Sequence, residues 1–440
     1  MSPTARVPAI LLLGLSISAG EPLYAADLLD VYQLAVRQDA RLKAAQAGFQ
    51  ASEELRPQAL SALLPQVSGN AQYSRENLEI NTQGFGSESG TFNSRGYSLR
   101  LDQVIYNHGS IVRLRQSSAR IARARARLGA VAQALIVRVS EAYFNVLAAE
   151  DNVRFAVAEK KAIYRQLEQA RQQFQVGMIA ITDVKQARAA YDLAVAQQVS
   201  AANRVAVRRE ALLVITGQLP ARLAQVQRRI PLITPKPADI SQWVATAIRQ
   251  NLQLIAAQFA TEAASLEVSR RRAGHYPTLG LFAEMSNQDT GGIFGAQETD
   301  DEMIGIEVNV PLYSGGFVSS ATQQASYLFA QAQQLQAQQR RETVRQTRAA
   351  YLNVMAGISR VKALRQALVS NRAAANAARI GFKVGTRTSV DVLVALRDMF
   401  RTQRDLASAR YRYLLNTLRL KQAAGTLMVD DLSVLNTWLG

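Results

Sequence analysis

Two stretches of the chain carry apolar or small residues at alternating spacings of three and four. The first covers residues 142–174 with a polar break at Lys160, and the second covers residues 350–382 with a break at Asn371. This is the spacing of a heptad repeat, in which one stripe of side chains faces a neighbouring helix. Both stretches are therefore predicted to be α-helices that pack as coiled coils, and their many Ala and Gly positions allow close packing.

These helices are predicted to be unusually long. No proline lies between Pro65 and Pro220 or after Pro311, and proline is the residue that most strongly interrupts a helix. The first helix is expected over about 109–176, which at 1.5 Å per residue gives a length of about 100 Å. Shorter helical stretches at 28–64 and 240–272 are expected to complete the layer, the first of them broken by Pro57.

A tight turn is expected at the end of each long helix. Gly177 and Gly385 fit the glycine that ends a helix, and Thr182 and Ser389 are candidates to cap the return helix that follows. The two antiparallel helical hairpins are expected at about 109–217 and 316–424, with tips at about 174–184 and 382–392.

Alternating apolar and polar residues predict a β-hairpin before each helical hairpin, at about 66–106 and 278–313. One face of these strands is largely apolar and the other largely polar, as in a transmembrane barrel with a wet lumen. Two half-buried hairpins of a soluble sheet would show the same alternation, and the strand pattern alone leaves both open. The Gly-, Ser- and acid-rich loops at 81–93 and 288–301 are expected outside.

The two halves of the chain are copies of one unit. Residues match at an offset of 212 around the first helix of each half, and at an offset of 208 beyond the loops, where Asp183 lies over Asp391 and Gly217 over Gly425. A constant offset over so many residues indicates one structure used twice. The predicted division is repeat 1 at 26–220, a linker at 221–238, repeat 2 at 239–427 and a short C-terminal segment at 428–440.

The N-terminus has the pattern of a secretory signal peptide, predicted at 1–25. Arg6 supplies a basic start, an apolar run begins at Ala9, and Ala25 and Ala26 offer a cleavage site. The run is shorter than the roughly 20 residues of a membrane-spanning helix, and no later segment is expected to reach that length and hydropathy.

Composition removes several classes of function. The chain has no cysteine and two histidines, His108 and His275, so disulfides, thiol nucleophiles and a histidine metal centre are not predicted. No nucleophile elbow or phosphate-binding loop is present, and neither an enzyme nor a cofactor is expected. The net charge is +17, but the arginines are spread along helices of an exported chain, so nucleic acid is not a predicted partner.

Four strands cannot close a barrel, and open strand edges in lipid would leave backbone groups unsatisfied. If the strands form a membrane barrel, several chains must therefore share it. Two chains would give eight strands with a filled interior, and three would give twelve strands with a passage. A function as a duct would favour three chains.

Two segments at the tips resemble the TolC-type outer-membrane factors of type I secretion and tripartite efflux. They are Phe174-Gln175-Val176-Gly177-Met178-Ile179-Ala180-Ile181-Thr182-Asp183-Val184 and Val384-Gly385-Thr386-Arg387-Thr388-Ser389-Val390-Asp391-Val392-Leu393. The resemblance covers essentially the whole chain beyond the signal peptide. It implies a mainly α fold with a membrane β-barrel, in which a homotrimer forms a 12-stranded barrel in the outer membrane, continued by a helical barrel across the periplasm.

The same resemblance implies partners and a gate. A periplasmic adaptor and an inner-membrane transporter of the ABC or RND type dock at the helical tips and open them, so that proteins or small toxic compounds leave the cell. By position, Thr182 and Asp183 match family residues that form the closing hydrogen bonds and a salt bridge at the tips. Arg387 matches the cationic partner of those residues, and Asp391 matches one of two aspartates that surround the constriction.

This chain departs from the family pattern at two gate positions. Val394 replaces the second aspartate of the constriction, and Phe382 replaces a tyrosine that bonds the copy-one aspartate, so a less acidic and looser gate is expected. Adaptor contacts are expected at Val176, Gly177, Ala180, Val384, Gly385, Thr386 and Ser389. A periplasmic coiled-coil protein or an adaptor would also explain the helices, but not four barrel-type strands in two copies.

Overall fold

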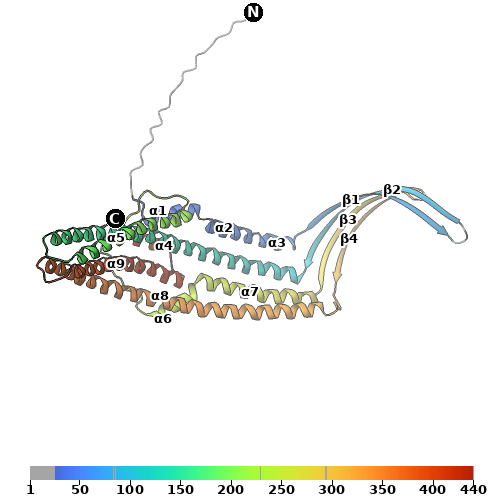
Figure 1. Ribbon diagram of the computed structural model, residues 1–440. Helices are drawn as coiled ribbons and strands as arrows, with labels where there is room; N and C mark the ends of the chain where they lie inside the picture. The colour runs from blue at the N-terminus through green and yellow to red at the C-terminus, as the bar shows by residue number, and fades with distance from the viewer. Residues whose placement is uncertain (1–24, 83, 85, 228, 293–294, 440) are drawn as a thin grey trace, which may run out of the picture.

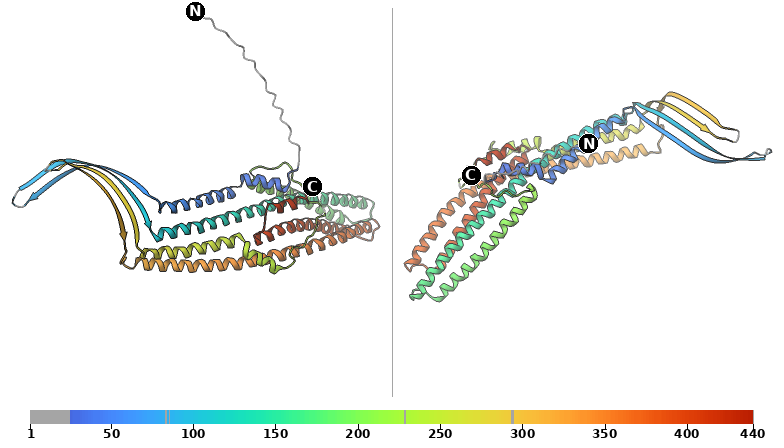
Figure 2. Two further views of the ribbon diagram at one scale, coloured as in Figure 1. Left: turned by 180° about the vertical axis from the view of Figure 1, so that it is seen from behind. Right: turned by 90° about the horizontal axis from the view of Figure 1, so that it is seen from above.

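The computed structural model describes residues 25–439 except 83, 85, 228 and 293–294, so residues 1–24 of the predicted signal peptide lie outside the described part. The described chain is elongated. A β-sheet lies at one end, a layer of long helices runs from it, and the helical tips lie at the other end (Figures 1 and 2).

The sheet is antiparallel and contains β1 (Gln66–Thr82), β2 (Gly86–Tyr106), β3 (Thr278–Thr290) and β4 (Gln297–Asn309) in that order. The central pair joins the two copies, with Leu99 opposite Met285. β1 and β4 are paired on one side only within the described chain. The strands are longer than predicted, because β1 pairs with β2 up to Thr82 and Gly86 and so takes in most of the expected loop at 81–93.

The long helices end close to the predicted positions. α4 covers His108–Gln175 (68 residues) and α8 covers Phe317–Lys383 (67 residues), while the return helices α5 (Ile181–Thr216) and α9 (Ser389–Ala424) each have 36 residues. Toward the tips, α4 packs between α5 and α9, and α9 packs against α8. Toward the sheet, α7 (Leu252–Arg272) fills the space between α4 and α8.

One expectation about hydropathy was wrong. α4 contains an 18-residue window that is long and apolar enough to cross a membrane. However, 56% of that window is buried inside the protein, and side chains such as Leu135 and Tyr143 are fully covered. Packing against the rest of the chain therefore accounts for the apolar character of this helix.

The shorter helices break where a polar side chain caps the next helix. In copy one, α1 (Leu28–Gln38) gives way to α2 (Ala40–Glu53) at Asp39, which accepts a hydrogen bond from the Leu42 amide at 2.8 Å. In copy two, α6 (Ile240–Gln250) gives way to α7 at Asn251, the residue 212 positions later. The break expected at Pro57 is present: α2 ends at Glu53 and α3 (Leu55–Ser61) begins at Leu55, so Pro57 lies in the first turn of α3, where its missing N–H has no helical partner to lose.

A second layer covers one face of the helices at mid-length. It consists of α1, α6, α10 (Asp430–Asn436) and the chain between α5 and α6, and it buries a continuous apolar core. Tyr143 of α4 is fully buried beneath it and donates a hydrogen bond to the Ala224 carbonyl at 2.6 Å. We call it the equatorial layer.

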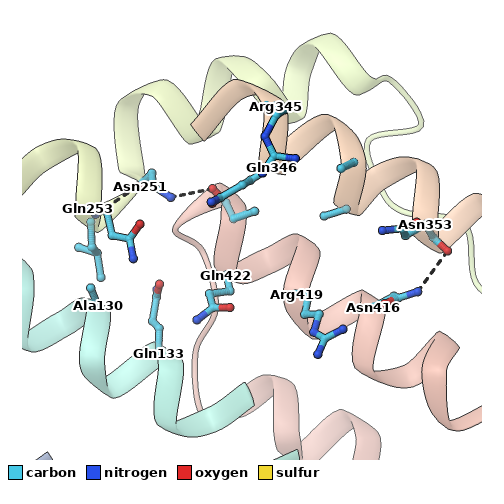
Figure 3. A pocket seen from close by; sticks show the side chains of 14 residues that line it. Ala130, Gln133, Asn251, Gln253, Arg345, Gln346, Asn353, Asn416, Arg419 and Gln422 are labelled. Atoms are coloured by element: carbon cyan, nitrogen blue, oxygen red, sulfur yellow. Dashed lines mark hydrogen bonds between the residues drawn. The ribbon is translucent and has the colours of Figure 1, made fainter. Parts of the chain in front are cut away.

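The end of α9 is joined to both copies at this level. The Asn251 amide donates to the Ala423 carbonyl at 3.0 Å, and the Gln133 amide donates to the carbonyls of Gly425 and Leu427, each at 3.1 Å. Figure 3 shows these side chains around a small polar cavity between α4, α7, α8 and α9. The contacts satisfy carbonyl groups that the end of a helix leaves without partners.

Candidate functional site at the helical tips

The two tips share one backbone geometry. Gly177 and Gly385 adopt φ values of 77° and 79°, a left-handed conformation that favours glycine. Val176 and Val384 before them have φ of −97° in both copies. The amide of residue 178 donates to Gln173, and that of residue 386 donates to Gly381, at 2.9 Å each. Each long helix therefore ends in the same turn.

The return helices begin differently, and the predicted caps were wrong. α9 is capped by Thr388, not Ser389: Asp391 donates its amide to the Thr388 hydroxyl, and the Asp391 carboxylate accepts from the Thr388 amide at 3.0 Å. α5 is capped by Ala180, not Thr182, and Ala180 has no side chain that can accept a hydrogen bond. Thr182 is the second residue of the helix.

The two equivalent aspartates consequently have different surroundings. The hydrogen bonds from Thr388, together with the nearby charge of Arg387, lower the pKa of Asp391. Asp183 occupies the same place in α5, half-buried, and no hydrogen bond to its carboxylate is found among the described residues. Asp183 is therefore the aspartate whose oxygens are available to a donor from another chain.

Three of the predicted gate residues lie around one groove between α8 and α9. Arg387, Asp391 and Val394 line it together with Asp398, and its volume is about 510 Å³. Arg387 is exposed and Val394 is 40% exposed. The groove thus presents one cation and two carboxylates, with the apolar Val394 beside them.

The structure does not bring all predicted gate residues together within one chain. In the part of the chain that the structure describes, Arg387 forms no ion pair with Asp183 and no hydrogen bond with Thr182. Phe382 is 3% exposed and belongs to the interior of the hairpin, so its ring contributes to packing and does not point into solvent. The predicted contact between Asp183 and Arg387 is therefore not formed within one described chain.

Most of the predicted docking residues are exposed, with one exception. Val176 and Val384 are 70% and 68% exposed, and Gly177, Ala180, Gly385 and Thr386 are also exposed. Ser389 is fully buried and accepts a hydrogen bond from Gln166 of α4 at 3.3 Å. It therefore joins the two hairpins of one chain and is not accessible to an adaptor, which corrects its assignment.

Sequence reasoning missed a set of buried polar contacts between α4 and α9. Glu159 of α4 pairs with Arg404 of α9 at 2.5 Å, and Asp151 accepts a hydrogen bond from the Tyr411 hydroxyl at 2.7 Å. Burial raises the pKa of Tyr411 to about 12, so its hydroxyl stays a donor at neutral pH. The heptad pattern gives no signal for them, because Asp151 and Glu159 lie outside its positions 149, 153, 156 and 160.

Comparison with known proteins agrees with this architecture. The profile of the family described as outer membrane efflux protein matches residues 31–218 and again residues 243–426. The chain is 36% identical to the outer membrane protein TolC of Escherichia coli, covering 98% of this chain and 88% of that protein. It is 29% identical to the alkaline protease secretion protein AprF of Pseudomonas aeruginosa, over 94% and 87%.

Solved structures show the same fold. The outer membrane protein VceC of Vibrio cholerae superposes with a TM-score of 0.77 at 20% identity, over 90% of this chain and 96% of that one. CusC superposes with a TM-score of 0.78 at 16% identity, over 97% and 99%.

Fold and site together define a protomer of an outer-membrane channel with a large periplasmic helical portion. The chain belongs to the outer membrane efflux protein family, and it is a channel of the efflux and secretion class. The prediction of a duplicated unit, a β-hairpin followed by a long helical hairpin, is confirmed, since the family profile matches the chain twice.

Proposed function

We propose that three copies of this chain form one continuous duct, with a 12-stranded barrel in outer-membrane lipid and a helical barrel in the periplasm. The observation that carries the proposal is the position of the two unpaired strands. β1 and β4 lie at opposite edges of the described sheet, and in lipid their free backbone groups need partners. Pairing β4 of one chain with β1 of the next satisfies both edges, and three chains leave a passage.

The helical layer supports the same arrangement. In the described chain, α5 and α8 lie at the two sides of the helical layer near the tips, where α5 packs mainly against α4 and α8 mainly against α9. Exposed apolar residues remain on α5, including Leu193 and Val199 at 60% and 66% exposure. Packing α5 of one chain against α8 of the next would cover them.

We also propose a role for each part of the chain. Repeats at 26–220 and 239–427 supply alternate sectors of the tube, the 221–238 segment belongs to the equatorial layer, and the tips at 174–184 and 382–392 form the gate. Asp183 of one chain pairs with Arg387 of its neighbour when the gate is closed. The duct carries out no catalytic step and uses no cofactor, metal or nucleic acid.

A periplasmic adaptor and an inner-membrane transporter of the ABC or RND type are the proposed partners, and exported proteins or small toxic compounds are the cargo. The exposed Val176 and Val384, with Gly177 and Gly385 beside them, offer two apolar turns per chain for the adaptor. The two turns share one geometry, so three chains present six similar contacts.

Site-specific photocross-linking in cells tests this assignment. A photoreactive residue at Val176 or Val384 is expected to capture a periplasmic adaptor, and purification of the product is expected to recover an inner-membrane transporter. The same probe at Val214, which is 83% exposed but far from the tips, is the matched control. Capture that is equal at Val214 and at the tips would contradict docking at the tips.

A further inference from the structure

The sequence of α4 contains an unusual density of arginine near the sheet. Arg120, Arg123 and Arg127 are spaced by three and four residues and therefore lie on one face of the helix, about 4.5 and 6 Å apart along its axis. Together with residues of α2, α3, α7 and α8, they line a cavity of about 660 Å³. A cavity lined by so many neighbouring helices of a single layer lies on the concave side of that layer.

The heptad register shows independently which side this is. Arg120 and Arg127 occupy one heptad position, which recurs at Glu141. Tyr143 lies two residues beyond Glu141, about 200° round the helix, and it is buried beneath the equatorial layer. A tube with an open passage carries an additional layer on its outside. The arginine face therefore points toward the passage.

These arginines lack acidic partners. No ion pair of the described chain involves Arg120, Arg123 or Arg127, and the Nε of Arg123 is buried without a hydrogen-bond partner. Burial and the charges of Arg127 and Arg120 lower the pKa of Arg123. The buried Nε of Arg123 beside two further cations favours binding of an anion, and the exposed Arg120 and Arg127 leave the cluster accessible to it.

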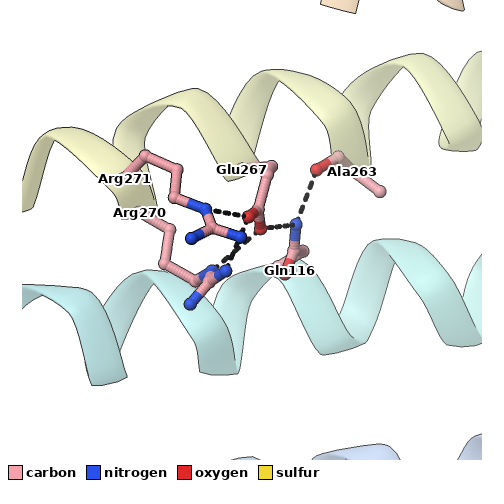
Figure 4. A network of polar contacts seen from close by, with 5 residues as sticks. All are labelled: Gln116, Ala263, Glu267, Arg270 and Arg271. Carbon is pink, nitrogen blue, oxygen red and sulfur yellow. Dashed lines mark hydrogen bonds and ion pairs between the residues drawn. The ribbon is translucent and has the colours of Figure 1, made fainter. Parts of the chain in front are cut away.

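One carboxylate lines the same cavity within the described chain, and it is already engaged. Glu267 accepts hydrogen bonds from Arg270 and Arg271 of its own helix, at 2.6 and 2.8 Å, and from Gln116 of α4 at 3.1 Å (Figure 4). It therefore does not neutralise the three arginines of α4. At an offset of 208, copy two has Leu328, Gln331 and Leu335 in their place, so the charge belongs to copy one alone.

We propose that Arg120, Arg123 and Arg127 form a cationic collar inside the duct that binds carboxylate groups of acidic polypeptide as it passes. The inference rests on the proposed trimer, in which three chains place nine guanidinium groups around the passage. Guanidinium binds carboxylate through paired hydrogen bonds, and a ring of such groups suits a chain with several acidic side chains. The collar accounts for part of the net charge of +17.

Channel block by poly-L-aspartate tests the collar. In planar bilayers, the trimer with Arg120→Gln and Arg127→Gln is expected to require about tenfold more poly-L-aspartate for half-block than the native channel. Its preference for chloride over potassium is also expected to fall. The matched control is Arg115→Gln with Arg125→Gln, which removes two charges from the opposite face of the same helix and is expected to leave both values unchanged.

Two further results separate charge from structure. Arg120→Lys with Arg127→Lys keeps the charge and is expected to restore most of the block. Equal changes in the Arg120/Arg127 and Arg115/Arg125 pairs, or no change in either, would overturn the collar. Native protein that forms no channels would instead contradict the proposed function, so the two failures are distinguishable.

Discussion

Glu159 of α4 and Arg404 of α9 form an ion pair with 2.5 Å between Oε2 and Nη1, although the Glu159 side chain is only 4% exposed. The pair joins the copy-one hairpin to the copy-two hairpin about midway between the tips and the equatorial layer. Opening of the tips by separation of these hairpins would have to break it. A buried carboxylate without its partner is strongly unfavourable, so the pair favours the arrangement in which the two hairpins stay together.

Removing the cation is therefore expected to loosen the gate. Arg404→Ala leaves Glu159 buried and unpaired, at a cost of about 3 kcal/mol, and the resting conductance of the purified channel should rise. Arg401→Ala is the control, because Arg401 lies on the same helix, is exposed and takes part in no ion pair of the described chain. Equal conductance of the two variants would contradict this role for Glu159 and Arg404.

The missing cap of α5 provides a second test. Ala180→Thr supplies the hydroxyl that Thr388 provides in copy two, and it should stabilise the start of α5 by about 1 kcal/mol. The new contact would also occupy Asp183 and remove it from the neighbouring chain. Amide exchange at the start of α5 is expected to slow while resting conductance rises.

Ala180→Val adds bulk without a hydroxyl and serves as the control for the added cap. If it reproduces both effects, or if Ala180→Thr slows exchange without raising conductance, Asp183 does not hold the gate closed.

Val394, the apolar residue in the tip groove, provides a test of cation block. Val394→Asp adds a carboxylate beside Asp391 and Arg387, so divalent cations should block the channel more strongly and resting conductance should fall. Val390→Asp places the same charge on the same helix, at an exposed residue that does not line the groove. Stronger block from Val390→Asp than from Val394→Asp would show that the groove is not the constriction.

The Glu267 network predicts a pH dependence of stability. Hydrogen bonding from Arg270, with smaller effects from Gln116 and Arg271, lowers the pKa of Glu267 to about 2 from its usual 4.5. A lowered pKa means that the carboxylate contributes stability above pH 4.5, and that this contribution is lost as the pH falls toward 2. The melting temperature of the native protein should therefore drop more steeply across this window than that of Glu267→Gln.

Glu262→Gln controls for the loss of any carboxylate from α7, because Glu262 is exposed and takes no part in the hydrogen bonds of this network. Parallel pH profiles for native protein and Glu267→Gln would exclude the network as the cause.

The sequence predicts the large elements well because their signals are strong. The heptad stripe and the lack of proline place α4 and α8, and Gly177 and Gly385 place both tips within a residue or two. It is harder to predict from the sequence which of two neighbouring residues caps a helix. Thr388 and Ser389 are adjacent potential caps, and only the contact of Ser389 with Gln166 shows which of them faces inward.

Contacts between distant segments are also beyond a single-sequence argument. Glu159 and Arg404 are separated by 245 residues, and no local pattern pairs them. Extension of β1 and β2 through the predicted loop depends on cross-strand pairing, which compensates for the low strand propensity of Gly and Ser there.

Native mass spectrometry of the complex extracted from outer membranes tests the central claim most directly, because the duct requires several chains to close one barrel around the unpaired edges of β1 and β4. The account predicts a single dominant species with the mass of three mature chains. A monomer, or a complex of two chains whose eight strands leave no passage, would contradict it.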